Sequence, residues 1–256
     1  FSFPGSTWER YPGGSTSSGA NYELKHPSSI KFKLETLQMS YPQAPWTLRG
    51  HAIQTVQLID IEKARPLIPK ELEIVSVWPG KTLGGVYLSA YESGSVLEYS
   101  ELIVVPAVVS KAGKIGGWVS HIYVDNSDSV AGGREIWGLP KQLAEFTWEK
   151  GEQSSVIVRQ DNRQLCSLRY SHPSFALPMP LSGDVFSTFG ADLLLFKGEV
   201  NSRFGFISSK LEVSAESPFA RLNLGQPWLT VYCDDARLVV HEPKVVGNTS
   251  IEFNYQ

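Results

Sequence analysis

Glu101 is the first residue whose type and position suggest chemistry, because it opens the apolar segment Leu102-Ile-Val-Val-Pro106. An ionised carboxylate is costly to bury in such surroundings, so Glu101 should take up a proton or pair with a cation such as Lys141 or Arg134. Either state suits a group that exchanges protons with a substrate. Tyr99 shares a strand face with Glu101, so its hydroxyl can orient the carboxylate or a substrate oxygen. The structural alternatives are a carboxylate at a sheet edge and a tyrosine in the core.

The most distinctive motif lies further along the chain. Tyr123-Val-Asp-Asn126 is followed by a Ser/Asp-rich turn and then by Gly133-Arg-Glu-Ile-Trp-Gly-Leu-Pro-Lys-Gln-Leu-Ala144. This combination resembles acetoacetate decarboxylases and their relatives, in which a Y-x-D-N strand end precedes G-R-E and then P-K before an apolar strand. Ile68-Pro69-x-x-Leu72 and Tyr99-Ser100-Glu101 agree with the same pattern. The resemblance covers residues 45–170.

The resemblance implies that Lys141 is a nucleophile. In that family the lysine of the P-K pair attacks a ketone, and the resulting imine withdraws electrons from the adjacent carbon–carbon bond as carbon dioxide leaves. Free lysine has a pKa of about 10.4, so the role requires burial or a neighbouring cation to disfavour the ammonium form. Acetoacetate decarboxylase is itself a known example of the second effect. Outside such a motif, a lysine after a turn proline is usually a surface residue.

Several positions depart from the decarboxylase pattern. The family's second lysine, directly after the first, is replaced by the neutral Gln142. The arginine that pairs with the substrate carboxylate falls at Gly50, and Arg49, one position away, should face elsewhere if the segment is extended. One of the family's two pocket glutamates falls on Val86. These departures argue against efficient acetoacetate decarboxylation and leave imine chemistry open.

The resemblance and the residue types together define a candidate site. We expect Lys141 and Glu101 to be catalytic, and Tyr99, Arg134 and Gln142 to bind substrate. The arginine and glutamate of the G-R-E segment, Arg134 and Glu135, also have a structural interpretation, as a buried ion pair or a turn-stabilising pair that holds the loop carrying the lysine. A lysine at position 142 should lower the pH at which an imine forms, by adding the missing like charge.

The sequence predicts neither a metal nor a cofactor. Gly113 to Gly117 lacks the order of a phosphate-binding loop and is expected to be a hairpin turn. Cys166 and Cys233 lie far apart and are expected to be small core residues. The histidines have no spacing typical of metal ligands, and no carboxylates cluster around them: His26, His51, His121, His172 and His241.

The elements that must position these residues are mostly short strands, separated by Gly, Pro, Asn or Asp turns. Such spacing predicts a mainly β fold of antiparallel, curved sheets that form a barrel or cone around a pocket, with few short helices. Helical turns are expected at 61–68, opened by Asp60, at 128–135 and at 218–222. The expected strands are 52–59, 85–91, 99–109, 117–125, 144–150, 155–160, 164–170, 193–200, 202–207, 209–214 and 228–242.

Composition limits the domain organisation and the partners. The chain has 256 residues with 23 basic and 26 acidic side chains in no like-charged block, so nucleic-acid binding is not expected. No membrane span or signal peptide is apparent, which favours a cytoplasmic location. Residues 1–33 are expected to be an extended arm, and residues 34–256 one domain. The expected partners are a small-molecule substrate and, from the family resemblance, further copies of the chain in a homo-oligomer.

Two functions of different classes remain open at this point. The first is a Schiff-base-forming lyase that acts on an oxo acid or related carbonyl compound, of the decarboxylase or aldolase-dehydratase type. The second is a binding or accessory protein that holds a hydrophobic molecule, such as a carotenoid or terpenoid, in the barrel. Plant proteins needed for neoxanthin formation resemble Leu83-Gly-Gly85 and Gly138-Leu-Pro140 but carry a serine at the position of Lys141. The lysine in this chain therefore favours an enzyme.

Overall fold

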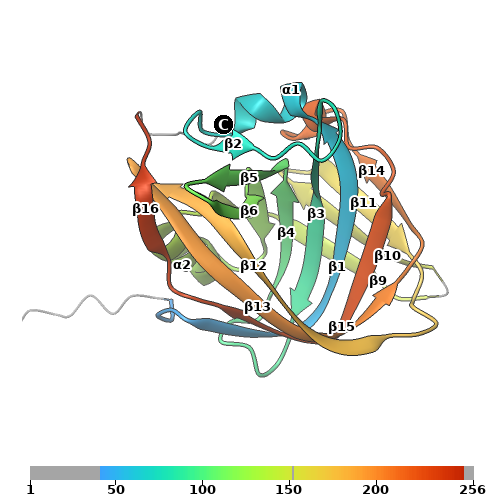
Figure 1. Ribbon diagram of the computed structural model, residues 1–256. Helices are drawn as coiled ribbons and strands as arrows, with labels where there is room; N and C mark the ends of the chain where they lie inside the picture. The colour runs from blue at the N-terminus through green and yellow to red at the C-terminus, as the bar shows by residue number, and fades with distance from the viewer. Residues whose placement is uncertain (1–40, 152, 251–256) are drawn as a thin grey trace, which may run out of the picture. The chain divides into compact units, whose positions relative to one another are not determined.

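The structure is a computed structural model that describes residues 41–151 and 153–250 (Figure 1). The expected arm over residues 1–33 and the expected start of the folded region at Leu34 lie outside the described residues. The described part of the chain is mainly β with few short helices, as predicted. Its strands form two sheets.

The larger sheet has twelve strands. In chain order they are β1 (Trp46–Asp60), β2 (Glu73–Ile74), β3 (Lys81–Tyr91), β4 (Tyr99–Val105), β5 (Ala107–Lys111), β6 (Lys114–Trp118), β7 (His121–Val124), β8 (Lys141–Leu143), β12 (Leu177–Phe189), β13 (Asp192–Phe206), β15 (Leu229–Val240) and β16 (Lys244–Asn248). Their order in the sheet is β2-β5-β6-β12-β13-β15-β1-β3-β4-β7-β8, with β16 paired to β13. The pairs β6–β12 and β7–β8 are parallel, and the other pairs are antiparallel.

The smaller sheet packs against the larger one through a shared core. Its strands are β9 (Glu145–Glu149), β10 (Ser154–Gln160), β11 (Arg163–Tyr170) and β14 (Ser209–Val213), in the order β14-β11-β10-β9. Val156 and Leu168 of this sheet belong to the same buried cluster as Leu88 and Leu102 of the larger sheet. This core covers one face of the central strands and leaves their other face for a pocket.

The long strands of the larger sheet are strongly curved, as Figure 1 shows for β1, β13 and β15. The register of β1 against β15 shifts between Gly50 and Ala52, and that of β13 against β15 shifts between Asn201 and Arg203. Such irregularities bend and twist a sheet. Within the described residues the two end strands, β2 and β8, do not pair with each other, so the sheet curls without closing.

The expected helical segments are present, with different ends. The first is split into α1 (Ile61–Ala64) and the 3-10 turn η1 (Arg65–Leu67), and η2 (Ala220–Leu222) lies in the third segment. The Asp60 side chain does not cap α1, contrary to prediction. Its carboxylate instead pairs with Lys81 at 2.6 Å and Lys63 at 3.4 Å.

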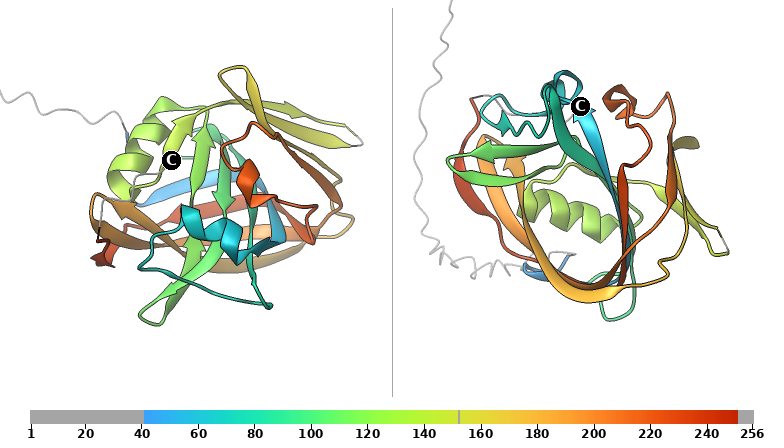
Figure 2. Two further views of the ribbon diagram at one scale, coloured as in Figure 1. Left: turned by 90° about the horizontal axis from the view of Figure 1, so that it is seen from above. Right: turned by 45° about the vertical axis from the view of Figure 1, so that its right-hand side comes forward.

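Helix α2 (Ser127–Trp137) is the element that carries the G-R-E motif. It begins after Asn126, whose side-chain oxygen accepts a hydrogen bond from Ser129 N, and it ends at Gly138, which has a left-handed φ of 60°. The helix packs against β7, β8 and β12, and it is the long green helix in both views of Figure 2. The position of α2 therefore determines where the residues around Lys141 lie.

Several strands differ from prediction. Pro106, which cannot donate to the ladder, divides the expected strand 99–109 into β4 and β5. The expected strand 117–125 is divided into β6 and β7, whereas the two expected strands from 193 to 207 form one strand, β13. Strand β12 is absent from the predictions, because Pro178, Pro180 and Gly183 in its first half argue against a strand.

Candidate active site

Lys141 and Glu101 come from strands on either side of β7. Lys141 begins β8 and pairs with Ile122, whereas Glu101 of β4 pairs with Val124. Strands two positions apart in a sheet are separated by about 10 Å, a distance that a lysine and a glutamate side chain can bridge together. Lys141 Nζ donates to Glu101 Oε1 at 2.8 Å, and the two side chains are only 4% and 5% exposed. The structure therefore brings the two expected catalytic residues together.

Helix α2 supplies the other wall around the lysine. Ser129 and Gly133 lie four residues apart and so share one face of the helix. Lys141 Nζ also donates to Ser129 Oγ at 3.0 Å. A Cβ on Gly133 would lie 2.4 Å from Lys141 Cδ and 2.7 Å from Cε, so only glycine leaves room for the lysine stem in this position.

Three tyrosines surround the ion pair. Lys141 Nζ lies 3.5 Å from the Tyr99 hydroxyl and 4.9 Å from the centre of its ring. Tyr91 donates to Glu101 Oε2 at 3.3 Å, and the hydroxyls of Tyr91 and Tyr87 are also 3.3 Å apart. Burial raises the pKa of all three phenols, and nearby Glu101 raises it further. They therefore stay protonated at neutral pH and can act as hydrogen-bond donors.

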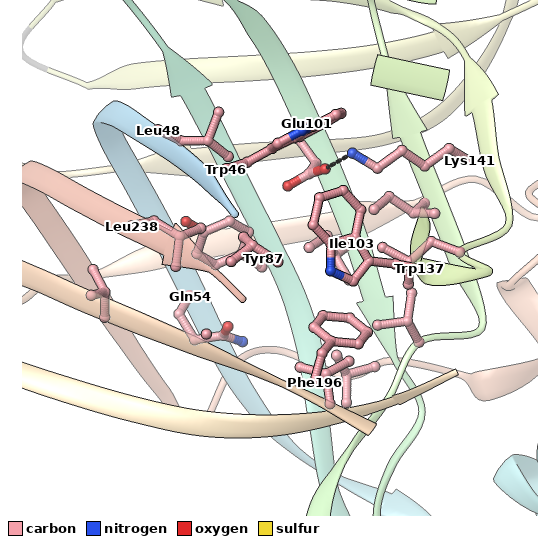
Figure 3. A pocket seen from close by; sticks show the side chains of 18 of the residues that line it. Trp46, Leu48, Gln54, Tyr87, Glu101, Ile103, Trp137, Lys141, Phe196 and Leu238 are labelled. Carbon is pink, nitrogen blue, oxygen red and sulfur yellow. Dashed lines mark hydrogen bonds and ion pairs between the residues drawn. The ribbon is translucent and has the colours of Figure 1, made fainter. Parts of the chain in front are cut away.

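The ion pair lies at the wall of an apolar cavity of about 250 Å³ (Figure 3). The Trp46 and Trp137 rings meet edge to face in this wall, with centroids 4.9 Å apart. The remaining lining residues come from seven strands, the link between β6 and β7, and the segment after α2: Leu48, Gln54, Tyr87, Tyr99, Ile103, Val105, Val119, Ile122, Leu139, Val185, Phe196, Gly198, Val200, Cys233, Leu238 and Val240. The site thus combines a buried lysine, a carboxylate paired with it and an apolar cavity.

Arg134 and Gln142 do not line this cavity, contrary to the prediction that they bind substrate. The exposed Arg134 donates from Nε to the backbone oxygen of Lys141 at 2.7 Å and makes no ion pair with its neighbour Glu135, which instead accepts a hydrogen bond from Tyr41. Arg134 therefore holds the backbone of the lysine, as expected of a residue that supports this loop, whereas the expected buried ion pair with Glu135 is wrong. Gln142 accepts from Gln160 at 3.0 Å, because successive strand residues point to opposite faces.

The position of Gln142 changes the expected effect of a lysine there. An ammonium group at position 142 would point away from Lys141 toward the partly exposed side of β8. We therefore expect Gln142→Lys to leave the pH dependence of imine trapping close to that of the wild type, against the expectation from the sequence. Reduction of the imine with borohydride, which traps it as a stable adduct, is measured over a series of pH values. A clear shift of the trapping profile to lower pH in the variant would show that the two side chains interact.

The positions that depart from the decarboxylase pattern also have structural consequences. At Gly50, with φ 153°, a Cβ would lie 1.9 Å from the Ala90 oxygen, so this backbone cannot carry an arginine there. Arg49 is exposed and lies outside the cavity lining, as predicted from strand alternation. Val86 is fully buried and is also not part of the lining. Neither expected position supplies a charged group to the site.

His121 is a buried histidine that begins β7, the strand between those of Lys141 and Glu101. It is 3% exposed, its ring lies 5.7 Å from that of Phe219, and its Nε2 has no hydrogen-bond partner among the described residues. Burial, helped by the positive charge of Arg221, lowers its pKa from 6.5 to about 4. The ring is therefore neutral in the folded protein under conditions where an unfolded chain would bind a proton.

This shift predicts a loss of stability in mild acid. Because the folded-state pKa is lowered, the stabilisation is complete above pH 6.5 and is lost as the pH falls from 6.5 towards 4. The loss attributable to His121 should reach about 3 kcal/mol. His121→Gln, which does not titrate, should reduce this slope in denaturant unfolding measured across the same window. An unchanged slope would show that other groups cause the acid sensitivity.

Several residues of the site come together only in the folded chain and were not predicted to belong to it. Trp46 and Trp137 lie 91 positions apart in the sequence and form one wall of the cavity. Ser129 could have been noted, since it lies one helical turn before the glycine of the G-R-E motif. Cys233, expected to be a core residue, is buried and also lines the cavity.

Two further findings concern the described residues as a whole. They include no group of three or more His, Cys, Asp or Glu side chains arranged to hold a metal ion. None of the helices in residues 41–151 and 153–250 has the length and apolar character needed to cross a bilayer.

Comparison with protein families gives a match to acetoacetate decarboxylase over residues 34–202. The protein NEOXANTHIN-DEFICIENT 1 of Solanum lycopersicum is 32% identical over 109 residues, which are 43% of this chain and 37% of that protein. The acetoacetate decarboxylase of Paraburkholderia phytofirmans is 32% identical over 126 residues, or 48% of this chain and 47% of that enzyme. The matches thus span less than half the length of either relative.

A solved structure shows the same fold at low sequence identity. The crystal structure of acetoacetate decarboxylase from Legionella pneumophila superimposes with a TM-score of 0.65 and 18% identity, covering 81% of this chain and 89% of that one. The similarity extends the resemblance beyond residue 170, where the sequence motifs end. It supports the predicted fold.

Proposed function

The chain belongs to the acetoacetate decarboxylase family, and from this premise we propose that it is an enzyme that joins Lys141 to a substrate carbonyl group as an imine. The observation that carries the proposal is the position of Lys141 Nζ. It is buried at the wall of an apolar cavity and lies within one hydrogen bond of both Glu101 and Ser129. A buried lysine with no chemical role would be costly to keep.

The ion pair supports each step of such a reaction. Glu101 Oε1 takes the ammonium proton, which leaves a neutral amine whose nitrogen lone pair attacks the carbonyl carbon. Proton return from Glu101 to the carbinolamine oxygen releases water and forms the iminium. The iminium nitrogen then accepts the electron pair of the bond that breaks next to the former carbonyl carbon. The resulting enamine takes up a proton at the carbon that lost its substituent, which regenerates the iminium. Water then hydrolyses the iminium and restores Lys141.

The bond that breaks distinguishes two reaction types. In a decarboxylase it joins the α-carbon to a carboxylate, and carbon dioxide leaves. In an aldolase-dehydratase the enamine adds to a second carbonyl compound or is formed by its departure. Both reactions use the same iminium on Lys141, so the ion pair supports the lyase class and both types within it.

A second candidate function is the binding of a hydrophobic molecule without chemistry. It is favoured by the lining of the cavity, which consists almost entirely of aliphatic and aromatic side chains. The similarity to NEOXANTHIN-DEFICIENT 1 agrees with a family in which members differ in role. The buried Lys141 separates the two functions, since simple binding needs no nucleophile.

Reductive trapping tests the proposal directly. The protein is incubated with a panel of ketones, aldehydes, and 2-oxo and 3-oxo acids, treated with borohydride and analysed by mass spectrometry. We expect a stable adduct with at least one compound, located by peptide mapping on Lys141. Absence of an adduct across the panel, with a hydrophobic ligand still bound, would favour the binding function. Assembly as a homo-oligomer and a cytoplasmic location stay predictions.

A further inference from the structure

The two charged side chains that line the cavity among the described residues neutralise each other when no substrate is bound. In the described lining, Lys141 is the cation and Glu101 the anion, and they are paired at 2.8 Å. Arg134 is held by the Lys141 backbone, and Arg49 faces outside. A substrate carboxylate would therefore enter next to Glu101 with no cation of its own, which is strongly unfavourable in a buried site.

The cavity has room for a sizeable apolar body. Its volume is about 250 Å³, and smaller cavities of about 150 Å³ in apolar cores already hold benzene. Leu48, Ile103 and Phe196 contribute to an apolar lining that continues beyond the ion pair (Figure 3). The gain from burying a ligand here rises with the apolar surface that the ligand brings.

Gln54 is the polar exception in this lining, apart from the tyrosines and the ion pair. Figure 3 places it on the opposite side of the cavity from Lys141. Its Nε2 donates to the backbone oxygens of Thr55 at 2.7 Å and Val86 at 3.3 Å. These two acceptors fix the orientation of the amide, and no hydrogen bond from a described residue reaches its Oε1. The cavity thus presents a hydrogen-bond acceptor far from the nucleophile.

We propose that the substrate is an uncharged carbonyl compound with an extended apolar body and a hydroxyl or other hydrogen-bond donor at its far end. Such a substrate has no carboxylate to lose as carbon dioxide, so this assignment selects the aldolase-dehydratase type of reaction over decarboxylation. The carbonyl group meets Lys141, the apolar body fills the space between, and the donor reaches Gln54 Oε1. The reacting end of this assignment rests on the proposed function, whereas the apolar body and Gln54 rest on the cavity alone. Gln54 is then a specificity-determining residue.

The test uses a straight-chain methyl ketone, its terminal hydroxyl derivative and its terminal carboxylate derivative, each over a range of lengths, together with short 2-oxo and 3-oxo acids. The corresponding secondary alcohols cannot form an imine, so their binding, followed by quenching of Trp46 and Trp137 fluorescence, reports on the cavity alone. Borohydride trapping of the carbonyl compounds reports on the chemistry. Failure of trapping with retained alcohol binding would reject the proposed function and keep the assignment of the cavity.

In the wild type we expect affinity to rise about fourfold for each added methylene until the cavity is full. The hydroxyl derivative should bind about fivefold tighter than its unsubstituted parent, and the carboxylate at least about tenfold weaker. We call the affinity of the hydroxyl derivative divided by that of its unsubstituted parent the hydroxyl preference. In Gln54→Met this ratio should fall to about one. Gln160→Leu, which alters a glutamine outside the cavity, should keep that preference.

Two results would overturn the inference. One is preferential binding or trapping of the short oxo acids or the terminal carboxylates by the wild-type protein, which would require a cation that the cavity lacks. The other is a hydroxyl preference that survives in Gln54→Met, or one that is absent from the wild type. The comparison of acids with neutral compounds needs no variant, so it decides even if Gln54→Met does not fold.

Discussion

Lys141→Met is expected to abolish the borohydride-trapped adduct for every carbonyl compound that labels the wild-type protein. Methionine keeps an unbranched apolar stem beside Gly133 but has no amine to attack a carbonyl carbon. Turnover should fall by roughly 10⁴-fold to 10⁶-fold, the scale observed when an enzyme loses its nucleophile. Intact mass and peptide mapping measure the first effect, and steady-state kinetics with the best substrate measures the second.

The Lys141→Met substitution also leaves the Glu101 carboxylate without its cationic partner. Removal of one member of a buried ion pair typically costs about 3–5 kcal/mol, so the variant should unfold at lower denaturant concentration. Lys141→Arg is the matched control, because it keeps a positive charge for Glu101 and its guanidinium stays protonated. Lys114→Met removes an exposed lysine and should trap normally. An adduct that persists in both Lys141 variants would place the nucleophile elsewhere.

Gly133→Ala should have the second largest effect, although it changes no group that reacts. The new Cβ would meet Lys141 Cδ at 2.4 Å and Cγ at 3.0 Å, and the flexible lysine stem is the part able to move. Its Nζ would then leave Glu101 Oε1 and Ser129 Oγ. A displacement of about 1 Å at a reacting group can cost about 10²-fold in rate, and we expect a loss of that order in trapping and turnover.

The stability of this variant separates displacement from unfolding. Alanine is favoured over glycine within a helix by about 1 kcal/mol, which offsets part of the strain, so the free energy of unfolding should change much less than the rate. Gly183→Ala is the matched control, because a Cβ there meets no atom within 4 Å. If Gly133→Ala formed the imine at the wild-type rate, the lysine would not depend on this contact.

The charged and polar groups around Lys141 also indicate which substrates the site can accept. The departures at Gly50 and Val86 remove charged groups, and the structure shows that no arginine side chain could occupy the first position on this backbone. Tyr87 and Tyr99, which line the cavity, remain as neutral donors because burial raises their pKa. The site therefore has hydrogen-bond donors for a carbonyl oxygen and lacks a cation for a carboxylate, which agrees with the uncharged substrate proposed above.

Local patterns in the sequence determined most of the strands and the two residues of the buried ion pair. Short β-branched segments between turn residues predicted most strands, because alternation along a strand is a local property. The P-K motif and Glu101 at the head of an apolar segment identified the two residues of the ion pair. Strand alternation placed Tyr99 with Glu101 and turned Arg49 away from the site, again from neighbours in the chain.

The tertiary structure decided which distant residues share the cavity and where the long side chains end. Trp46, Gln54 and Phe196 meet because β1 and β13 are joined through β15, and such pairing depends on long-range registers that no local pattern encodes. Arg134 can reach several acceptors, and only the packing of α2 on β8 selects the Lys141 backbone. Sequence thus identified the two residues of the buried ion pair, whereas sheet curvature and helix packing decided the shape of the cavity beside them.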